Sequence, residues 1–319
     1  MKFIEALNVG DNITEVYLCK EKRTGTKKDG QEYYLVTLQD KTGILEGNVW
    51  DTNSPGIQEF DKKQYVEVTG FIKEYKGKNQ INITRLTVVD SSKVEPENYI
   101  PCTDKDIDAM YDELLSIIKT IKAPYMKELL NMYFVNNEGF KKRFVYHSAA
   151  KSVHHGFVGG LLEHTLSVTK TCDFIAKQYD YLDRDLLLTA AIFHDIGKLA
   201  ELSPYPENDY TDEGQMLGHI VMGYNLLSKS MEEIEDFPKV KKNELLHCIL
   251  AHHGEYEFGS PKKPSIAEAI ALNFADDMDA KLETMKEVMS KVKGNDTSWQ
   301  GFNYLFDSNI RKTSEAYKE

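Results

Sequence analysis

The histidines of this chain lie in one region and recur beside carboxylates. All nine fall between residues 147 and 253. His194 and Asp195 are neighbours in the stretch AAIFHDIGKLAEL, although a helix that only faces a core needs neither side chain. Neutral imidazole and carboxylate are the ligand types that suit Mn²⁺, Fe²⁺, Co²⁺, Ni²⁺ or Zn²⁺. This pair therefore indicates metal chemistry.

Further histidines and aspartates stand among apolar residues, on or at the ends of expected helices. Helices can hold metal ligands because their side chains project inward from a rigid scaffold. A single histidine on an apolar face is more often a hydrogen-bonded core residue, so the prediction depends on the whole set. His147 and His247 are expected to be structural. The candidate residues are His164, His219, His252, His253, Asp276, Asp277 and Asp279.

The elements that must position these residues are helical from about residue 107 onward. Thr103 or Asp104 can cap a helix that contains MYDELLSIIKTI. Residues 107–319 are predicted to form an all-α domain whose core spans about residues 150–290. Residues 91–106, with two prolines and no regular periodicity, are expected to be an ordered linker. The further expected helices lie near residues 124–135, 137–146, 160–180, 183–194, 212–230, 239–252 and 265–293.

Residues 1–90 follow another pattern, with five β-rich runs separated by turns that carry glycine and lysine. Five short strands, with a small helical insert at about residues 55–61, predict a five-stranded barrel. Such a barrel resembles the OB-fold, whose sheet face and loops bind oligonucleotides. The predicted fold class is thus multi-domain α and β, with an N-terminal OB-like β-barrel followed by an all-α domain.

Basic residues cluster in two loops of the expected barrel, at residues 20–30 and 73–79. Aromatic residues close by in sequence could stack on the bases of a single strand. Lysine-rich hairpins can also be solvated turns, and strand aromatics can be core residues, so both interpretations stay open at this point. The loop residues predicted to bind a strand are Lys22, Arg23, Lys27, Lys28, Lys76 and Lys78. The aromatic residues are Tyr33, Tyr34, Trp50, Phe71 and Tyr75.

Charge and composition limit the function classes. The net charge of −12 disfavours a protein that coats nucleic acid by bulk attraction, although a local basic strip could hold one strand. Residues 1–90 carry 13 Lys and Arg against 14 Asp and Glu, so nearly all of the negative charge lies in residues 91–319. The sequence lacks an apolar run of about 18 residues and a signal-peptide pattern, so we expect a cytoplasmic protein without membrane association. The four cysteines form no C-x-x-C pair, which argues against a disulfide framework or a thiolate zinc site.

The order H…HD…H…HH…D over about residues 150–290 resembles the HD-domain superfamily of metal-dependent phosphohydrolases. In members of that superfamily with two metals, the aspartate of the HD pair bridges them. Asp276 is the expected last ligand because it follows alanine, as in the superfamily's A-D pattern, and it is favoured over Asp277 and Asp279. The resemblance implies one metal site formed by His164, His194, Asp195 and Asp276. The implied additional ligands are His219, His252 and His253.

Two neighbouring divalent ions can polarise a phosphoryl oxygen, lower the pKa of a bridging water and stabilise the leaving oxygen. Asp195 is thus an expected catalytic residue, and Lys198 could place an ammonium near a substrate phosphate, unless it is a helix C-terminal lysine favoured by the helix dipole. The basic segment at residues 141–160 would suit a phosphodiester backbone, or it is a solvated charged face. Its expected substrate contacts are Arg143, Lys151, His154 and His155.

The barrel and the HD pattern in one chain of this length, with the stretch SVHHGFVGGLLEHTLSV, resemble the YhaM family of 3′→5′ exoribonucleases of Gram-positive bacteria. The resemblance implies one or two divalent ions, with Mn²⁺ expected, although Fe²⁺, Co²⁺ and Ni²⁺ share the ligand preferences. It implies single-stranded RNA as substrate, single-stranded DNA as a further candidate, and 5′-mononucleotides as products. The barrel would hold the strand while the helical site cuts its 3′ end. A homo-oligomer is compatible with the sequence.

Two other functions stay open from the sequence. One is a phosphohydrolase of nucleotides or cyclic dinucleotides whose barrel serves protein contacts, and it predicts activity that survives removal of residues 1–90. The other is a non-catalytic nucleic-acid-binding adaptor whose histidines hold a structural metal or none. A closed four-ligand zinc site would favour the adaptor.

Overall fold

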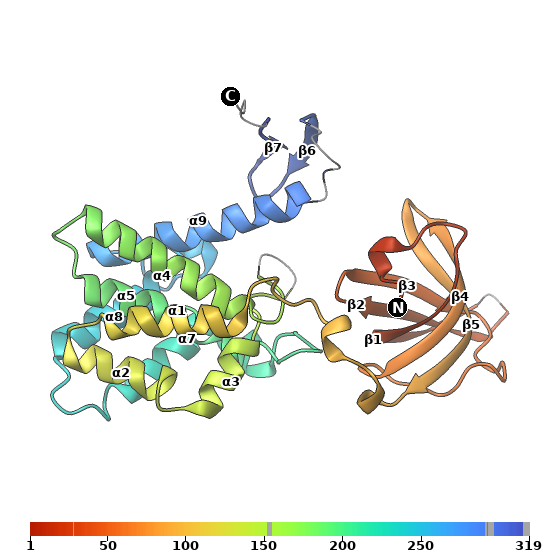
Figure 1. Ribbon diagram of the computed structural model, residues 1–319, viewed down its shortest axis with the longest axis horizontal. Helices are drawn as coiled ribbons and strands as arrows, with labels where there is room; N and C mark the ends of the chain where they lie inside the picture. The colour runs from red at the N-terminus through yellow and green to blue at the C-terminus, as the bar shows by residue number, and fades with distance from the viewer. Residues whose placement is uncertain (28, 152–154, 291, 293–296, 315–319) are drawn as a thin grey trace.

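The computed structural model describes residues 1–27, 29–151, 155–290, 292 and 297–314. Figure 1 shows two bodies side by side, an N-terminal β-barrel and a larger helical domain, with the connecting segment between them. Within the described residues, no helix is long and apolar enough to cross a membrane.

The barrel consists of five strands, β1 (Asn12–Thr26), β2 (Glu32–Asp40), β3 (Gly43–Val49), β4 (Tyr65–Tyr75) and β5 (Lys78–Val89). They close in the order β1-β2-β3-β5-β4, with β3 and β5 parallel and the other neighbours antiparallel. Alternate residues point inward, as the period of a strand requires, and fill the interior with valine, isoleucine and leucine. The sequence prediction of a five-stranded OB-like barrel is confirmed.

The prediction of a helical insert at about residues 55–61 is wrong. These residues form turns and one isolated bridge between Ile57 and Leu86. The backbone N–H of Leu86 donates to the carbonyl of Gly56, and that of Gln58 donates to the carbonyl of Leu86, each over 2.9 Å. The backbone groups of the insert are therefore satisfied by β5, and Pro55 and Gly56 disfavour a helix here.

The connecting segment is ordered and contacts both bodies. It contains the short 3-10 turns η2 (Ser91–Lys93) and η3 (Pro96–Asn98). On the barrel side, the Gln39 amide donates to the carbonyl of Tyr99 over 3.1 Å. On the helical side, the backbone N–H of Thr103 donates to the carbonyl of Val158 over 2.9 Å. The barrel and helical domain are thus joined by a segment whose backbone is bonded at both ends.

The helical domain follows, and several of its helix starts are capped by side chains that accept backbone N–H groups. The first cap is Asp106, which accepts from Ala109, rather than the expected Thr103 or Asp104. A short helix that the sequence pattern did not indicate, α6, follows the HD pair. The helices are α1 (Ile107–Lys119), α2 (Pro124–Phe134), α3 (Glu138–Tyr146), α4 (Gly160–Gln178), α5 (Arg184–Phe193), α6 (Lys198–Glu201), α7 (Asp212–Ser230), α8 (Lys239–Ala251) and α9 (Ala267–Ser290).

The core of this domain surrounds α5, which is buried on every side from Leu186 to Phe193. Phe134, Phe140 and Phe193 pack edge to face or tilted with centroid separations of 5.2 to 5.5 Å, which favours fixed ring positions. A helix that is apolar all round must lie inside the bundle, and the C-terminal end of α5 therefore lies within the protein rather than at the surface.

The chain departs from the all-helical pattern after α9. Strands β6 (Trp299–Asn303) and β7 (Ser308–Arg311) pair as a two-stranded antiparallel sheet. Figure 1 shows this hairpin standing away from the helices beyond the end of α9. Apart from Ile310, its residues are exposed or half-buried, so the core-facing periodicity that marks a strand is missing.

Candidate metal centre

His194 and Asp195 lie directly after α5, where the most buried helix of the domain ends. They are 0% and 2% exposed. The Nδ1 atom of His194 lies 2.8 Å from the carbonyl oxygen of Ala191 and donates its hydrogen there, because a carbonyl can only accept. This bond leaves the lone pair of Nε2 free to bind a cation.

A first group of ligand atoms meets the Nε2 atom of His194. The Nε2 atom of His164, from α4, lies 3.1 Å from it. The same His164 atom lies 3.2 Å from an Asp276 oxygen of α9 and 3.4 Å from Oδ2 of Asp195. Three helices that are far apart in sequence thus bring two imidazoles and two carboxylates to one point.

A second group lies on the other side of Asp195. Ligand atoms of His219, His252 and His253 lie within 4.8 Å of one another. His219 comes from α7, and His252 and His253 follow the end of α8. The Nδ1 atoms of His252 and His253 donate to the carbonyls of Ile249 and Phe258 over 2.7 and 2.8 Å, so their Nε2 atoms remain available.

Asp195 stands between the two groups. Its Oδ2 lies 3.4 Å from Nε2 of His164 and of His194, whereas its Oδ1 lies 3.4 Å from Nε2 of His219 and 3.7 Å from Nε2 of His252. One carboxylate therefore presents one oxygen to each group, which is the arrangement that a bridging ligand of two cations needs.

Three buried atoms of this centre have no hydrogen-bond partner among the described residues: Oδ1 of Asp195 and Nε2 of His219 and His252. A buried polar atom without a partner is costly, and such atoms in a folded protein call for an explanation such as an ion. All three are lone-pair donors that face one another, and their types suit first-row divalent metals. The residues present therefore fit a divalent metal site, as the HD fold implies.

The charges of the centre keep its carboxylates ionised. Burial alone would raise the pKa of Asp195, but Lys198, whose Nζ lies 2.7 Å from Oδ2, and His194 hold this pKa well below its usual range. Burial opposes the charge on Lys198 as well, yet Asp195 raises the pKa of that ammonium. Asp276 likewise has a lowered pKa, because its neighbouring histidines outweigh burial. Anionic oxygens are the form that a cation requires.

Two histidines of the second group, His252 and His253, are held neutral. Burial lowers the pKa of His252, and burial together with His252 lowers the pKa of His253 to about 4. His164 differs: burial would lower its pKa, but Asp195, Asp276 and Asp279 raise it well above the usual value. The carboxylates around its ring stabilise a positive charge there, which a proton or a metal ion can supply.

Two supporting carboxylates were missed as such by the sequence interpretation. Asp279, which the motif disfavoured as a ligand, lies 2.7 Å from Nδ1 of His164 and also accepts from Ser167. Glu201 of α6 lies 2.9 Å from Nδ1 of His219. Each fixes the ring so that Nε2 faces the centre. The signal for Asp279 was its place three residues after Asp276, on the same helix face.

Two glycines shape the backbone around His219. Gly218 has φ 72° and ψ 153°, which interrupts α7 and lets the N–H of His219 donate to Glu201 over 2.9 Å. A Cβ atom at Gly197 would lie 2.0 Å from the His219 carbonyl oxygen, so only glycine allows this approach. The glycine of the HD-x-G-K motif therefore permits the contact that places the second histidine group.

The centre opens into a cavity of about 450 Å³. Lys198, 16% exposed, reaches into it beside Asp195, so its ammonium can contact a bound anion. Asn273 also lines the cavity and donates to the His252 carbonyl over 2.7 Å. His164, His253 and Asp276 complete the wall nearest the ligand atoms.

The substrate contacts expected from residues 141–160 are not all brought to this cavity. Lys151 lies beside it and pairs with Asp209 over 2.6 Å. Arg143, on α3, lines a separate apolar groove with Ile196. His155 is buried, and its Nε2 lies 3.1 Å from Asp279, which places it behind His164 rather than on a substrate surface. His154 lies outside the described residues.

The barrel presents an aromatic surface close to basic side chains. The rings of Tyr33 and Trp50 stack with centroids 4.9 Å apart, and the Lys73 ammonium lies 5.7 Å from the Trp50 ring. The Trp50 indole, 42% exposed, donates to the Asn82 side chain over 3.1 Å, which fixes its orientation. Phe71, opposite Asn82 in the sheet, is exposed as well. Fixed, exposed rings beside a cation are the features of a base-stacking surface.

The predicted basic residues of the barrel divide by their partners. Lys22 donates to the Phe60 carbonyl over 2.7 Å and lies above the rings of Tyr34 and Phe60, so it is engaged within the barrel. Arg23 pairs with Glu21 over 2.8 Å on the surface. Three further predicted residues, Lys27, Lys76 and Lys78, are exposed or half-buried at the two loops. Lys28 lies outside the described residues.

Two family models agree with the division of the chain into a barrel and a helical domain. A family model described as "HD domain" matches residues 161–281, and one described as "OB-fold nucleic acid binding domain" matches residues 19–89. The second OB-fold domain of replication protein A from Methanococcus maripaludis is a similar solved structure; the match covers 29% of this chain and 96% of that one, with 23% identity and a TM-score of 0.23.

Curated relatives match along nearly the whole chain. The 3′-5′ exoribonuclease YhaM of Bacillus subtilis is 32% identical over 289 residues, 89% of this chain and 90% of that protein. The protein of the same name from Bacillus pumilus is 30% identical over 296 residues, 92% of each chain. With both domains matched in order and at this identity, the chain belongs to the YhaM family of exoribonucleases.

Proposed function

We propose that this protein is a divalent-metal-dependent 3′→5′ exoribonuclease that hydrolyses single-stranded RNA to 5′-mononucleotides. The observation that carries the proposal is the position of Asp195, whose two oxygens face two histidine groups. Among the described residues, its Oδ1 and the Nε2 atoms of His219 and His252 are buried without hydrogen-bond partners. The names of the relatives support the direction of attack and the substrate class. Single-stranded DNA is a second candidate substrate, and the cytoplasm is the expected place of action.

The residues would divide between two cations. His164, His194, Asp195 and Asp276 would hold one ion, and Asp195 with the second histidine group would hold the other. When bound, two such ions supply Lewis acidity, activate water near neutral pH and stabilise a leaving oxygen. We propose Mn²⁺, because imidazole and carboxylate together suit it, with Fe²⁺, Co²⁺ and Ni²⁺ as alternatives of like preference.

The side chains of the chain itself position the substrate. Lys198 keeps its charge because Asp195 raises its pKa, so its ammonium can bind a non-bridging oxygen of the terminal phosphodiester. Asp279 and Glu201 hold the rings of His164 and His219 and restrict the ligand geometry. Three helices and the ends of two others surround the centre, which opens to solvent through the cavities that its residues line.

The barrel supplies grip that the metal centre does not. Stacking on Trp50 and Tyr33 is independent of base identity, and Lys73 adds attraction for the backbone. Such a surface fits a nuclease that removes successive nucleotides of any sequence. Because the chain as a whole carries −12, binding must follow local positive charge and should weaken steeply with added salt.

The deciding experiment uses metal-stripped protein and single-stranded RNA labelled at either end, with Mn²⁺, Mg²⁺ or Zn²⁺ added back separately. Immediate release of labelled mononucleotide from the 3′ label, with a descending ladder from the 5′ label, is the expected result. Cleavage of cyclic dinucleotides but not of RNA would instead indicate a small-nucleotide phosphohydrolase. No cleavage with any metal would contradict the proposed activity.

A further inference from the structure

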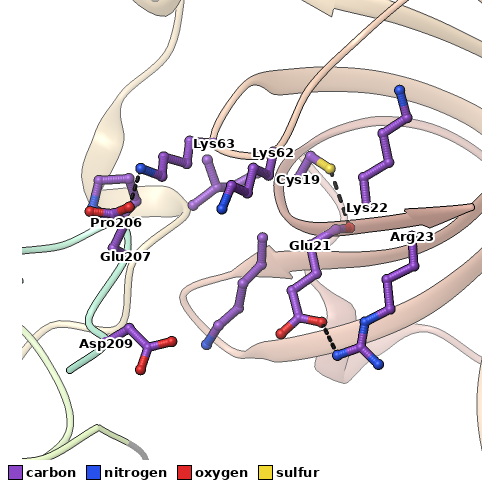
Figure 2. A pocket seen from close by; sticks show the side chains of 11 residues that line it. Cys19, Glu21, Lys22, Arg23, Lys62, Lys63, Pro206, Glu207 and Asp209 are labelled. Atoms are coloured by element: carbon purple, nitrogen blue, oxygen red, sulfur yellow. Dashed lines mark hydrogen bonds and ion pairs between the residues drawn. The ribbon is translucent and has the colours of Figure 1, made fainter. Parts of the chain in front are cut away.

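A second cavity, of about 280 Å³, lies where the barrel meets the loop between α6 and α7. Figure 2 shows Lys62 and Lys63 reaching from the barrel toward the loop that carries Pro206 and Glu207. Five cationic and three acidic side chains line this cavity, a local excess of positive charge in an acidic chain. The cations are Lys20, Lys22, Arg23, Lys62 and Lys63.

Only part of this positive charge is already engaged. Lys22 and Arg23 bond within the barrel, and Lys63 pairs with Glu207 across the interface. Lys20 and Lys62, by contrast, have neither an ion pair nor a side-chain hydrogen bond to any part of the chain that the structure describes. Two ammonium groups at one cavity without a protein anion are free to bind an external one.

The acidic side chains on the helical side of the cavity interact electrostatically with the barrel. The pKa of Asp209 is lowered first by its bond from Lys151 and also by the charge of Lys20. Both cross-cavity acids are held by exposed lysines: the Lys63–Glu207 pair is 44% and 41% exposed, and the Lys151–Asp209 pair 47% and 57%. Exposed ion pairs of this kind are weak, so phosphate groups can replace the carboxylates as partners of these lysines.

The cavity leads toward the metal centre. Asp209 lines it and bonds to Lys151, which lines an adjoining cavity of about 290 Å³ together with Tyr210 and Lys198. That adjoining cavity shares Ala149 and Lys198 with the cavity of the metal centre. Lysines therefore recur along a series of three neighbouring cavities, from the domain interface to the side chain that contacts Asp195, and the Asp209–Lys151 ion pair links the first two.

We propose that the phosphodiester backbone of a single RNA strand runs between the two domains along this series, with Lys20 and Lys62 contacting phosphates on the 5′ side of the nucleotide being removed. The proposal rests on the proposed function, whose substrate it locates. It explains why cations on one domain face a loop of the other, and why that loop carries acids that can release their lysines. Glu207 and Asp209 then oppose binding, whereas Lys20 and Lys62 promote it.

The two signs of charge give a sharp test. The variants are Lys20→Gln with Lys62→Gln, and separately Asp209→Asn. The matched control is Lys119→Gln with Lys122→Gln, two exposed lysines at the α1–α2 connection, which Figure 1 places at the far end of the helical domain from the barrel. Each is compared on an oligouridylate of about 15 nucleotides, long enough to reach the barrel, and on the dinucleotide UpU, which is not.

For the Lys20 and Lys62 pair, the ratio of kcat/KM on the oligomer to that on UpU should fall about tenfold, and it should rise about threefold for Asp209→Asn. The slope of log Kd against log salt for the oligomer should fall by about 1.4 when both lysines are removed, because each single-strand phosphate contact contributes about 0.7. The control should change neither quantity. Equal effects on oligomer and dinucleotide, or an unchanged salt slope, would overturn the path and leave the cavity as a small-anion site or a domain contact.

Binding of the oligomer to metal-free protein separates this inference from the proposed function. If no metal supports cleavage but the salt slope still falls in the lysine variant and not in the control, the path stands and the nuclease activity fails. If cleavage proceeds while the lysine variant behaves like the control in binding and in substrate-length preference, the activity stands and the path fails. Equal melting temperatures of all variants exclude misfolding as the cause of any change.

Discussion

Oδ2 of Asp279 lies 2.7 Å from Nδ1 of His164, so one carboxylate fixes the ring whose other nitrogen faces the metal centre. Asp279 also accepts from His155 and Ser167, which hold it in place. A carboxylate on the far nitrogen of a ligating imidazole fixes its tautomer and raises its basicity. Asp279 therefore belongs to the metal centre although it does not contact the other ligand atoms.

Asp279→Ala should weaken binding of divalent metal by about 10- to 100-fold, because His164 loses the partner that orients it. Excess metal should restore much of the activity, since the ligands themselves remain. Calorimetric titration of Mn²⁺ into the stripped protein measures the affinity. The control is Glu283→Ala on the same helix, which removes a carboxylate paired with Lys286 and not with a histidine. Equal affinity in the two variants would remove Asp279 from the centre.

Asp195→Asn should lower kcat by on the order of 10³ or more, because the proposed bridging carboxylate becomes a neutral amide. Binding of single-stranded RNA should change less than about twofold, because the barrel is untouched. A quenched-product assay and fluorescence anisotropy measure the two quantities. Asp112→Asn, on an exposed position of α1, provides the control. Near-normal turnover in the Asp195 variant would refute the bridging assignment.

Much of the centre could be predicted from the sequence, because histidine and aspartate among apolar helix residues are chemically unusual. The structure brings all seven predicted ligands into two adjoining groups. Asp279 and Glu201 could not be assigned in the same way, because a supporting carboxylate is recognised only by the ring nitrogen it meets. Their own residue types and helical positions equally suit a solvated face.

Most of the fold could also be predicted from the sequence. Strand and helix periods indicated the barrel and the bundle, whereas the β6–β7 hairpin buries too little to leave a periodic pattern. Lys22 was predicted to bind a strand from its basic loop, but the Phe60 carbonyl engages it, a contact between residues 38 apart in sequence. The cationic cavity at the interface depends on how two domains meet, which no local pattern contains.

Trp50→Ala should weaken binding of single-stranded RNA by about 1 to 3 kcal/mol, the usual contribution of one stacked base, and should leave turnover of UpU nearly unchanged. Anisotropy titration on an oligomer measures the loss. Tyr181→Ala is the control, because Tyr181 is 72% exposed but belongs to the helical domain. A comparable loss in both variants would argue against a specific stacking role for Trp50.

The contact between the linker and α4 should make stability depend on pH. Burial would raise the pKa of Glu163, but Lys105, 2.8 Å away, and the Thr103 hydroxyl lower it below its ordinary value of 4.5. A lowered folded pKa stabilises the protein above the unfolded pKa, and this stabilisation is lost as pH falls through the folded value. Glu163→Gln should thus cost about 1 to 3 kcal/mol above about pH 5.

The difference between wild type and Glu163→Gln should shrink as the pH falls below 4.5, because the wild-type carboxyl then becomes protonated. Urea unfolding of the helical domain, followed at several pH values, measures it. The exposed variant Glu113→Gln, which pairs with Lys170 on the surface, should cost less than about 1 kcal/mol. A pH-independent difference would show that Glu163 acts through packing rather than charge.

The ligands of the metal centre are spread from His164 to Asp276, and the barrel ends at Val89. During synthesis, the barrel can close while most of the helical domain has still to be made, because N-terminal domains fold first. The centre must wait until α9 has left the ribosome, since Asp276 and Asp279 both lie on it. Under the proposed function, a growing chain acquires the capacity to hold RNA before the capacity to cut it.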